Sequence, residues 1–221
     1  MIGCLSVYQE NYKPLAELTL ADNRMEYCER HGYLPVFREY PDMPGAPVPE
    51  IHRKLGFAKL DIILDVFEEH PNCAWAWFGD CDGMVTNMRF PLPVTPHTSQ
   101  GLLVSRDCHG ICAGTILAAN RPWVKDYFRQ LLADKDKYAH EQDAIIATMG
   151  QLTEAQFQII PQRLTNSYDY GLYPDAKPKP GFEEDVVKGQ WQKGDFFVHW
   201  PGRTLEQRIA HYHEYAKEVV R

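Results

Sequence analysis

Two aspartates one residue apart, Asp80 and Asp82, end an apolar, aromatic-rich run at residues 73–79. Residues two apart on a continuing strand point to the same side, so the two carboxylates would face the same space. Carboxylates that close repel each other unless a positive charge lies between them. Mn²⁺ and Mg²⁺ bind carboxylate oxygens and often share their coordination shell with substrate phosphates. The spacing therefore predicts a divalent cation site, while the letters GDCDG also fit an ordinary turn.

A histidine later in the chain adds a third ligand to this prediction. His199 follows apolar residues 196–198 and precedes a Pro-Gly turn. Imidazole nitrogen is a good ligand for borderline cations such as Mn²⁺. Taken alone, a histidine at a strand end is more often a structural residue. Together with Asp80 and Asp82 it predicts a three-ligand site that leaves positions open for phosphate oxygens.

The elements that would position these residues predict an α/β fold. Apolar runs at 2–8, 33–40 and 73–80 are typical of strands, and segments 13–32 and 51–70 carry apolar residues at helical spacing. This alternation of strands and helices is typical of a layered domain with parallel strands. Ligands bind at the carboxyl ends of the strands in such sheets, which is where the aspartate pair would lie.

The second half of the chain is less regular. Its segment 161–194 is rich in Pro, Gly, Tyr and Lys and is expected to be a long loop. Around it we expect strands or a hairpin over 99–107 and 110–120, helices over 121–136, 140–150 and 204–220, and strands over 155–161 and 194–202. We find no internal repeat and no convincing domain linker in the sequence, so we expect one domain over residues 1–221.

Composition and charge narrow the classes of partner. The 221 residues carry a net charge of −7, which argues against nucleic acid or an anionic membrane as the main partner. No stretch approaches the roughly 20 apolar residues of a membrane span, and no signal peptide is evident. The six cysteines form no CxxC pair and are expected to be free thiols of a reducing compartment, such as the cytoplasm. We expect a soluble bacterial or viral enzyme, or an excised catalytic domain.

Five short segments, in this order, resemble metal-dependent glycosyltransferases of the GT-A fold. The resemblance is strongest to the galactosyl and xylosyl transferases of glycosyltransferase family 34 and weaker to those of family 8. The segments are YCERHGY at 27–33, KLDIILDVFEEHPNCAWAWFGDCDGMVTN at 59–87, AGTILAANRPW at 113–123, EQDAI at 141–145 and FVHWPG at 197–202.

The resemblance implies the architecture of the whole chain. It implies a single GT-A domain, which is Rossmann-like, with a mixed and mostly parallel sheet flanked by helices. The nucleotide-binding part would span about residues 1–90, and the acceptor side about 91–221.

The same resemblance implies the chemistry. The donor would be a UDP-sugar held through its diphosphate by Mn²⁺ or Mg²⁺, and the acceptor a hydroxyl of a glycan or another molecule. Asp80 and Asp82 would be the D-x-D motif, and His199 the late metal-binding histidine. Members of family 34 retain the anomeric configuration, so an α-linked donor would give an α-linked product.

Further residues gain roles from the resemblance alone. The acidic-Gln segment beside the reacting sugar would supply Glu141, Gln142 and Asp143. Relatives commonly carry Asn at the position of Cys112, so the donor sugar is left open. The residues expected to bind the donor are Val7, Tyr8, Lys59, Asp80, Cys112, Gly114 and Arg203. Apart from the resemblance, aromatic faces stack on sugars, and the aromatic residues in or beside loops near this site that we expect on the acceptor side are Trp191, Trp200, Tyr168, Tyr170 and Tyr173.

Two other functions compete with a UDP-sugar glycosyltransferase. A nucleotidyltransferase would also place carboxylates at strand ends of an α/β sheet, but the N-terminal part lacks a glycine-rich phosphate loop with lysine. A sugar-nucleotide-binding module without catalysis would bind the donor and turn nothing over. The aspartate pair, the late histidine and the acidic segment together favour the enzyme.

Overall fold

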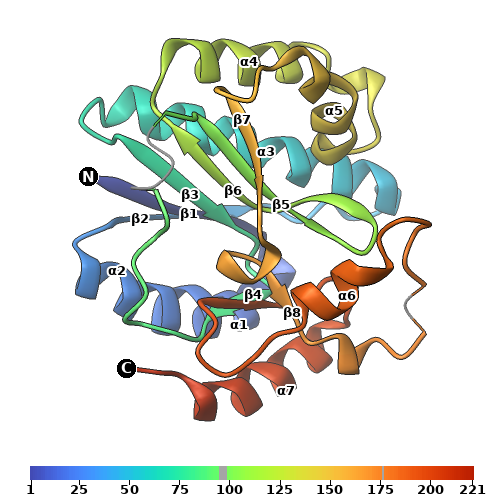
Figure 1. Ribbon diagram of the computed structural model, residues 1–221. Helices are drawn as coiled ribbons and strands as arrows, with labels where there is room; N and C mark the ends of the chain where they lie inside the picture. Colours follow the sequence, from blue (N-terminus) through green and yellow to red (C-terminus); the bar gives the residue numbers. More distant parts are fainter. Residues whose placement is uncertain (95–98, 176) are drawn as a thin grey trace.

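The computed structural model describes residues 1–94, 99–175 and 177–221, and a six-stranded mixed sheet forms its centre (Figure 1). The strands are β1 (Ile2–Gln9), β2 (Leu34–Tyr40), β3 (Trp75–Gly79), β5 (Leu102–Asp107), β6 (Gly110–Ala119) and β7 (Phe157–Ile160), in the order β2-β1-β3-β6-β5-β7. β1 is parallel to β2 and β3, β5 is parallel to β7, and β6 is antiparallel to β3 and β5. The predicted mixed, mostly parallel α/β sheet is confirmed.

Helices cover both faces of this sheet (Figure 1). On one side lie α3 (Val48–Glu69), α4 (Pro122–Ala133) and α5 (Glu141–Thr148), and on the other lie α1 (Lys13–Ala16) and α2 (Met25–His31). The last helix, α7 (Leu205–Tyr215), packs on α1, farther from the sheet. Successive residues of β3 serve the two faces, as the pleat requires. Phe78 packs in the core under α3, while Trp77 packs against Tyr27 of α2.

The first helical segment widens in its middle. Between α1 and α2, Glu17–Arg24 is a π-helical stretch, and Gly32, at φ 65°, ends the segment in a conformation that glycine adopts readily. π-helical turns are rare and are often found at functional sites. This stretch brings Thr19, Asn23 and Arg24 against the chain that follows β3.

A second sheet brings the histidine region to the aspartate pair. Its strands are β4 (Gly83–Val85), β8 (Ser167–Tyr168) and β9 (Phe197–His199), in the order β4-β9-β8. β4 begins directly after Asp82 and runs antiparallel to β9, so that Gly83 lies opposite His199. The sequence does not predict β4, because its three residues look like part of a turn.

Segment 161–194 contains more structure than expected. It holds β8, helix α6 (Glu183–Gly189) and two single 3₁₀ turns, Gln162–Leu164 and Tyr170–Leu172. The prediction of one long loop is therefore wrong. Because part of the segment is buried, its backbone groups need partners, and β8 finds them on β9. Among the described residues, further 3₁₀ turns lie at Glu10–Tyr12, Lys135–Lys137, Met149–Gln151 and Ala216–Glu218.

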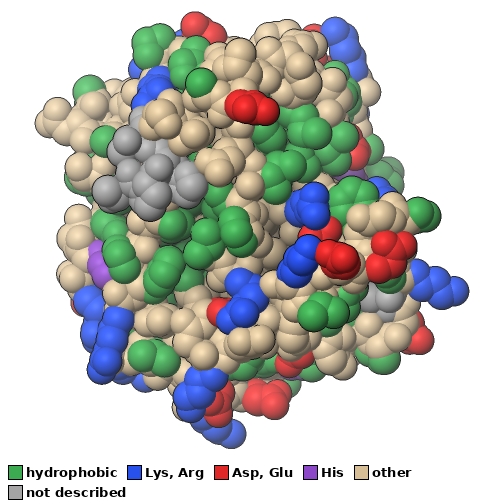
Figure 2. Space-filling model, viewed as in Figure 1, with side chains coloured by type: hydrophobic (Ala, Val, Ile, Leu, Met, Phe, Trp, Pro, Cys, Tyr) green, Lys and Arg blue, Asp and Glu red, His purple; other side chains and the backbone are tan. Residues whose placement is uncertain are grey.

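Three further features concern the charges on the surface, the hydrophobicity of the helices and the state of the cysteines. Figure 2 shows basic side chains beside acidic ones over much of one face. Among the described residues, no helix combines the length and the hydrophobicity that crossing a bilayer requires. The six cysteines are free thiols, as predicted, and all except Cys81 are buried.

Candidate active site

A cleft of about 760 Å³ opens at the carboxyl ends of β1 and β3. Strand ends of an open α/β sheet are the usual place for a ligand. Apolar strands and helices hold the polar lining side chains in fixed positions. Ten of the residues predicted to hold the cation, the donor or the reacting sugar line this cleft: Val7, Tyr8, Lys59, Asp80, Asp82, Cys112, Gly114, Glu141, Gln142 and His199.

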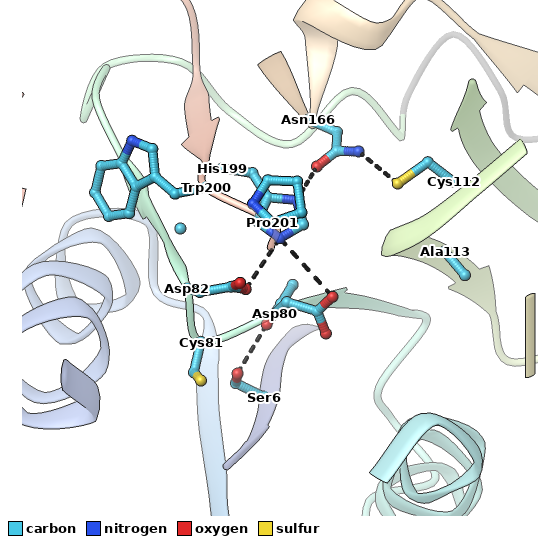
Figure 3. A network of polar contacts seen from close by, with 12 residues as sticks. Ser6, Asp80, Cys81, Asp82, Cys112, Ala113, Asn166, His199, Trp200 and Pro201 are labelled. Carbon is cyan, nitrogen blue, oxygen red and sulfur yellow. Dashed lines mark hydrogen bonds and ion pairs between the residues drawn. The ribbon is translucent and has the colours of Figure 1, made fainter. Parts of the chain in front are cut away.

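Asp80, Asp82 and His199 converge at one point of the cleft (Figure 3). One ligand atom from each lies within 4.8 Å of the others. His199 Nε2 is 2.9 Å from Asp82 Oδ1 and 4.0 Å from Asp80 Oδ2. The described part of the chain thus brings together two carboxylates from the connection between β3 and β4 and an imidazole from β9, a donor set that suits Mg²⁺ or Mn²⁺.

Arg208, at the start of α7, ion-pairs with Asp82 from the outer side. Its Nη2 lies 2.7 Å from Asp82 Oδ2, and its Nη1 donates to Tyr12 Oη at 2.8 Å. Burial by itself raises the pKa of Asp82, but the hydrogen bond and electrostatic attraction of His199 and the charge of Arg208 outweigh it and hold that pKa below its usual range. A capping box at Thr204 begins α7 and so sets the direction in which Arg208 points.

Lys59 bridges two carboxylates in the wall of the cleft. From α3, its Nζ lies 3.0 Å from Asp80 Oδ1, 2.8 Å from Glu141 Oε1 and 3.2 Å from the carbonyl oxygen of Ala113. Burial lowers the pKa of Lys59, but Asp80 and Glu141 together raise it above the ordinary value, so the ammonium stays charged. Gly56 leaves room for Glu141, because a Cβ at that position would overlap Glu141 Oε2.

The backbone around the aspartate pair is held from the π-helical stretch. Arg24, which is fully buried, donates to the carbonyl oxygens of Gly79, at 2.6 Å, and of Asp80 and Gly83. Thr19 Oγ1 donates to the carbonyl oxygen of Cys81 at 2.7 Å. These bonds fix the path of the chain from β3 into β4 and therefore the directions of both aspartate side chains.

Comparison with known proteins identifies the family. The model of the galactosyl transferase GMA12/MNN10 family matches residues 5–95 and 93–210. The chain belongs to this family. The matched residues include the whole cleft, from β1 to Arg208.

Curated relatives agree with this assignment at low identity. A probable alpha-1,2-galactosyltransferase of Schizosaccharomyces pombe, gmh2, is 23% identical over 231 residues, which cover 84% of this chain and 60% of that protein. A probable alpha-1,6-mannosyltransferase of Saccharomyces cerevisiae, MNN10, is 24% identical over 133 residues, which cover 47% of this chain and 33% of that protein. The chain thus spans about 60% of the length of the first of these GMA12/MNN10 relatives.

Solved structures share the fold. A glycosyltransferase involved in the glycosylation of the major capsid of PBCV-1 superposes with a TM-score of 0.73 at 17% identity, over 96% of this chain and 98% of that one. The galactosyltransferase LgtC, in complex with donor and acceptor sugar analogs, gives a TM-score of 0.55 at 14% identity, over 100% of this chain and 97% of that one. The GT-A fold implied by the sequence is confirmed.

The structure does not bring two of the candidate residues into the cleft. Asp143 is exposed on α5, because a helix turns about 200° over two residues and so directs Asp143 away from Glu141. Arg203 is absent from the described lining of the cleft and lies over the ring of Tyr173, 4.1 Å from its centroid. Arg208, which the sequence did not single out, takes the basic position beside the aspartate pair.

Of the aromatic residues expected on the acceptor side, three line the cleft and two do not. Tyr168, Tyr170 and Tyr173 line the cleft. Trp200 is fully buried, because it follows His199 on the chain and points to the opposite side, where its ring packs near Tyr215. The expectation that Trp200 offers an acceptor surface is therefore wrong. Trp191 is absent from the described lining and packs against the same tyrosine, with ring centroids 4.8 Å apart.

The sequence contains an indication of the role of Arg24, although we did not predict that role. It stands at helical spacing from Leu20, Tyr27 and Cys28, which are all buried. A basic residue in the apolar stripe of a helix needs buried acceptors, and here these are the carbonyl groups after β3. Asn166 contacts His199, and the sequence around it shows no pattern that would indicate this role.

Proposed function

We propose that this chain is a metal-dependent glycosyltransferase that transfers a sugar from a UDP-sugar to a hydroxyl of a glycan or another acceptor, with retention of configuration. The observation that carries the proposal is the convergence of Asp80, Asp82 and His199 in a cleft beside the Lys59–Glu141 pair. Family membership supports transfer chemistry, and the names of the galactosyltransferase relatives suggest galactose as the first donor sugar to test.

Asp80, Asp82 and His199 would hold Mn²⁺ or Mg²⁺. When bound, the cation would offset the negative charge that develops on the diphosphate leaving group. Val7 and Tyr8, at the end of β1, would contact the nucleoside. Because Arg208 pairs with Oδ2 of Asp82, Oδ1, on the side of His199, is the oxygen that would face the cation.

Glu141 and Gln142 would face the reacting sugar. In the transfer, the bond between the anomeric carbon and the diphosphate oxygen would break, the acceptor hydroxyl oxygen would bond to that carbon, and the hydroxyl proton would pass to the departing diphosphate. The sugar gains oxocarbenium-like charge on the way, which a nearby carboxylate stabilises. Lys59 would keep the Glu141 carboxylate in place, and Gln142 Oε1 is itself fixed by the backbone N–H of Ala113 at 2.9 Å.

The remaining wall would bind the acceptor. Tyr170, Tyr173 and Pro201 line the cleft beyond His199. Tyrosine rings suit a sugar because they offer an apolar face and a hydroxyl group that forms hydrogen bonds.

Binding of UDP is expected to require the cation. Calorimetric titration of UDP into the protein should show binding in Mn²⁺ and none after the addition of EDTA, because the diphosphate would otherwise face Asp80 and Asp82 alone. GDP serves as the matched control for the base, since a mannosyltransferase is among the relatives. A full signal with EDTA present contradicts the role of the cation.

The same protein sample separates the competing functions. Release of UDP from a UDP-sugar with transfer to an acceptor supports the proposal. Release of pyrophosphate from a nucleoside triphosphate would indicate a nucleotidyltransferase. Binding of UDP-sugars without transfer or hydrolysis would indicate a binding module.

Replacing Gly114 with alanine is expected to disturb the cation site. A Cβ at Gly114 would lie 2.6 Å from His199 Cε1 and 3.3 Å from Asp80 Oδ2, and His199 is buried and cannot move away. Overpacking of this kind lowers the free energy of unfolding by about 1–3 kcal/mol. Urea unfolding measures this loss, and titration of Mn²⁺ followed by electron paramagnetic resonance should show weaker binding.

Gly150→Ala is the matched control for this variant. A Cβ at Gly150 meets no atom within 4 Å. It should leave Mn²⁺ binding unchanged. If Gly114→Ala has the same free energy of unfolding and the same Mn²⁺ affinity as the wild type, the added Cβ does not disturb His199.

A further inference from the structure

A continuous line of polar side chains connects the wall of the cleft to His199. Asp107 Oδ2 accepts from Tyr168 Oη at 3.1 Å, and Tyr168 Oη lies 3.0 Å from Cys112 Sγ. Asn166 Nδ2 is 3.1 Å from Cys112 Sγ, and Asn166 Oδ1 is 2.9 Å from His199 Nδ1. All five residues are buried, and the inner part of the line is visible in Figure 3.

Each group in this line has only one consistent role as donor or acceptor. The Asp107 carboxylate can only accept, so the Tyr168 hydroxyl donates to it. The hydroxyl proton is then used, and the Cys112 thiol must donate to the Tyr168 oxygen. The Cys112 sulfur in turn accepts from the amide NH₂ of Asn166. The second amide proton goes to Ser105 Oγ at 3.2 Å.

The direction of the line determines that Nδ1 of His199 carries a proton. With the NH₂ of Asn166 turned toward Cys112 and Ser105, the side-chain oxygen of Asn166 faces His199. That oxygen carries no proton, so His199 Nδ1 must donate to it. Asp82 Oδ1 can also only accept, so without a cation Nε2 donates to it at 2.9 Å, and Nε2 is the nitrogen whose proton a cation would replace.

We propose that Asp107, Tyr168, Cys112 and Asn166 form a directional hydrogen-bond relay that keeps a proton on His199 Nδ1 and so leaves Nε2 as the nitrogen that would bind the cation. Asn166 is thereby a positioning residue, since it acts through His199. Outer partners of this kind fix the tautomer and the ring orientation of metal-binding histidines. The role toward the cation rests on the proposed function, whereas the proton on Nδ1 does not.

Cys112 fits the relay because a thiol can donate and accept at once. Burial raises the pKa of Cys112 to about 12, so the thiol keeps the proton that it must donate. This gives the residue a role at a position where related enzymes commonly carry asparagine. Serine can take the same two roles, and alanine can take neither.

The proton on Nδ1 is tested directly on the metal-free protein. Long-range ¹H–¹⁵N correlation spectra of protein labelled at histidine should show a proton on His199 Nδ1. A His199→Gln variant assigns the signal. A His199 ring whose Nδ1 carries no proton would overturn the relay, and this result is independent of any metal binding.

The effect on the cation is tested with Mn²⁺ alone, by electron paramagnetic resonance of the free ion. Asn166→Leu should weaken Mn²⁺ binding by about 10- to 100-fold, and Cys112→Ala by about tenfold. Cys112→Ser should restore wild-type binding and the Nδ1–H signal. If Asn166→Leu does not fold, the two Cys112 variants decide, and equal Mn²⁺ affinity for both would sink the relay.

A pair of tyrosine variants provides the matched control. Tyr168→Phe removes the acceptor of the Cys112 proton and should weaken Mn²⁺ binding. Tyr127→Phe removes a buried hydroxyl that bonds to Thr148 Oγ1 instead, at 2.7 Å, away from the described lining of the cleft, and should leave the affinity and the Nδ1 proton unchanged. If the wild type binds no Mn²⁺, the proposed cation is wrong, while the spectra still decide whether Nδ1 carries the proton.

Discussion

An Asp82→Asn variant is expected to transfer sugar about a thousandfold more slowly than the wild type, with greatly weakened Mn²⁺ binding. Asparagine keeps the shape of Asp82 but removes the charge that lies 2.9 Å from His199 Nε2 and 2.7 Å from Arg208 Nη2. A catalytic cation contributes several kcal/mol of charge stabilisation in the transition state, and about 1.4 kcal/mol is tenfold in rate. The measurement is kcat/KM for transfer, together with Mn²⁺ affinity.

Asp195→Asn is the matched control for Asp82→Asn. The two aspartates are 9% and 8% exposed, and each is paired with an arginine at 2.7 Å, Arg163 in the case of Asp195. Asp195 is absent from the described lining of the cleft, so its variant should keep Mn²⁺ affinity and transfer. Equal loss of transfer in both variants would trace the effect to folding. Full transfer by Asp82→Asn would remove Asp82 from the proposed site.

Much of the fold could be predicted because each element in the first half of the chain carries its own hydrophobic pattern. The strands β1, β2 and β3 are short apolar runs, and α3 has apolar residues at helical spacing, so each element can be recognised from its own residues. The second sheet could not be predicted in this way. β4 and β8 have three and two residues and exist only because β9 pairs with both.

Some residues of the candidate site could likewise be predicted from local sequence patterns, and others could not. Asp80, Asp82 and His199 follow apolar strands, and strand ends meet at one edge of a sheet, so their meeting could be expected from the sequence. Arg208 lies on the surface helix α7 and reaches the site only through the packing of that helix. Asn166 depends on the short strand pairing of β8 with β9. Tertiary contacts place such side chains, and these contacts cannot be inferred from the neighbouring residues in the sequence.

Replacing Lys59 with methionine is expected to lower the free energy of unfolding by about 3–5 kcal/mol, the cost of removing one partner from a buried ion pair. Met preserves the length of the side chain and its packing on α3. It leaves Asp80 and Glu141 without the ammonium that lies within 3.0 Å of each, and the Glu141 side chain is only 5% exposed. Urea unfolding measures the loss, and transfer should fall with it because Glu141 is no longer held.

Arg38→Met is the control, since it breaks a pair with Asp65 on the same helix α3 at 2.6 Å. The side chains of that pair are 34% and 43% exposed, and a pair in water contributes at most about 1 kcal/mol. A Lys59→Met loss as small as that of Arg38→Met would mean that water already screens Asp80 and Glu141.

The double variant Lys59→Met, Glu141→Gln separates charge from packing. If the loss arises from an uncompensated carboxylate, neutralising Glu141 should restore part of the stability that Lys59→Met removes, and the two changes should not add. Additive losses would instead indicate that the methionine packs badly against its neighbours. Transfer should stay low in the double variant in either case, because the glutamine at 141 supplies no negative charge for the sugar in the transition state. Recovery of stability without recovery of transfer would therefore assign to Lys59 the task of holding Glu141, and to Glu141 the contact with the donor.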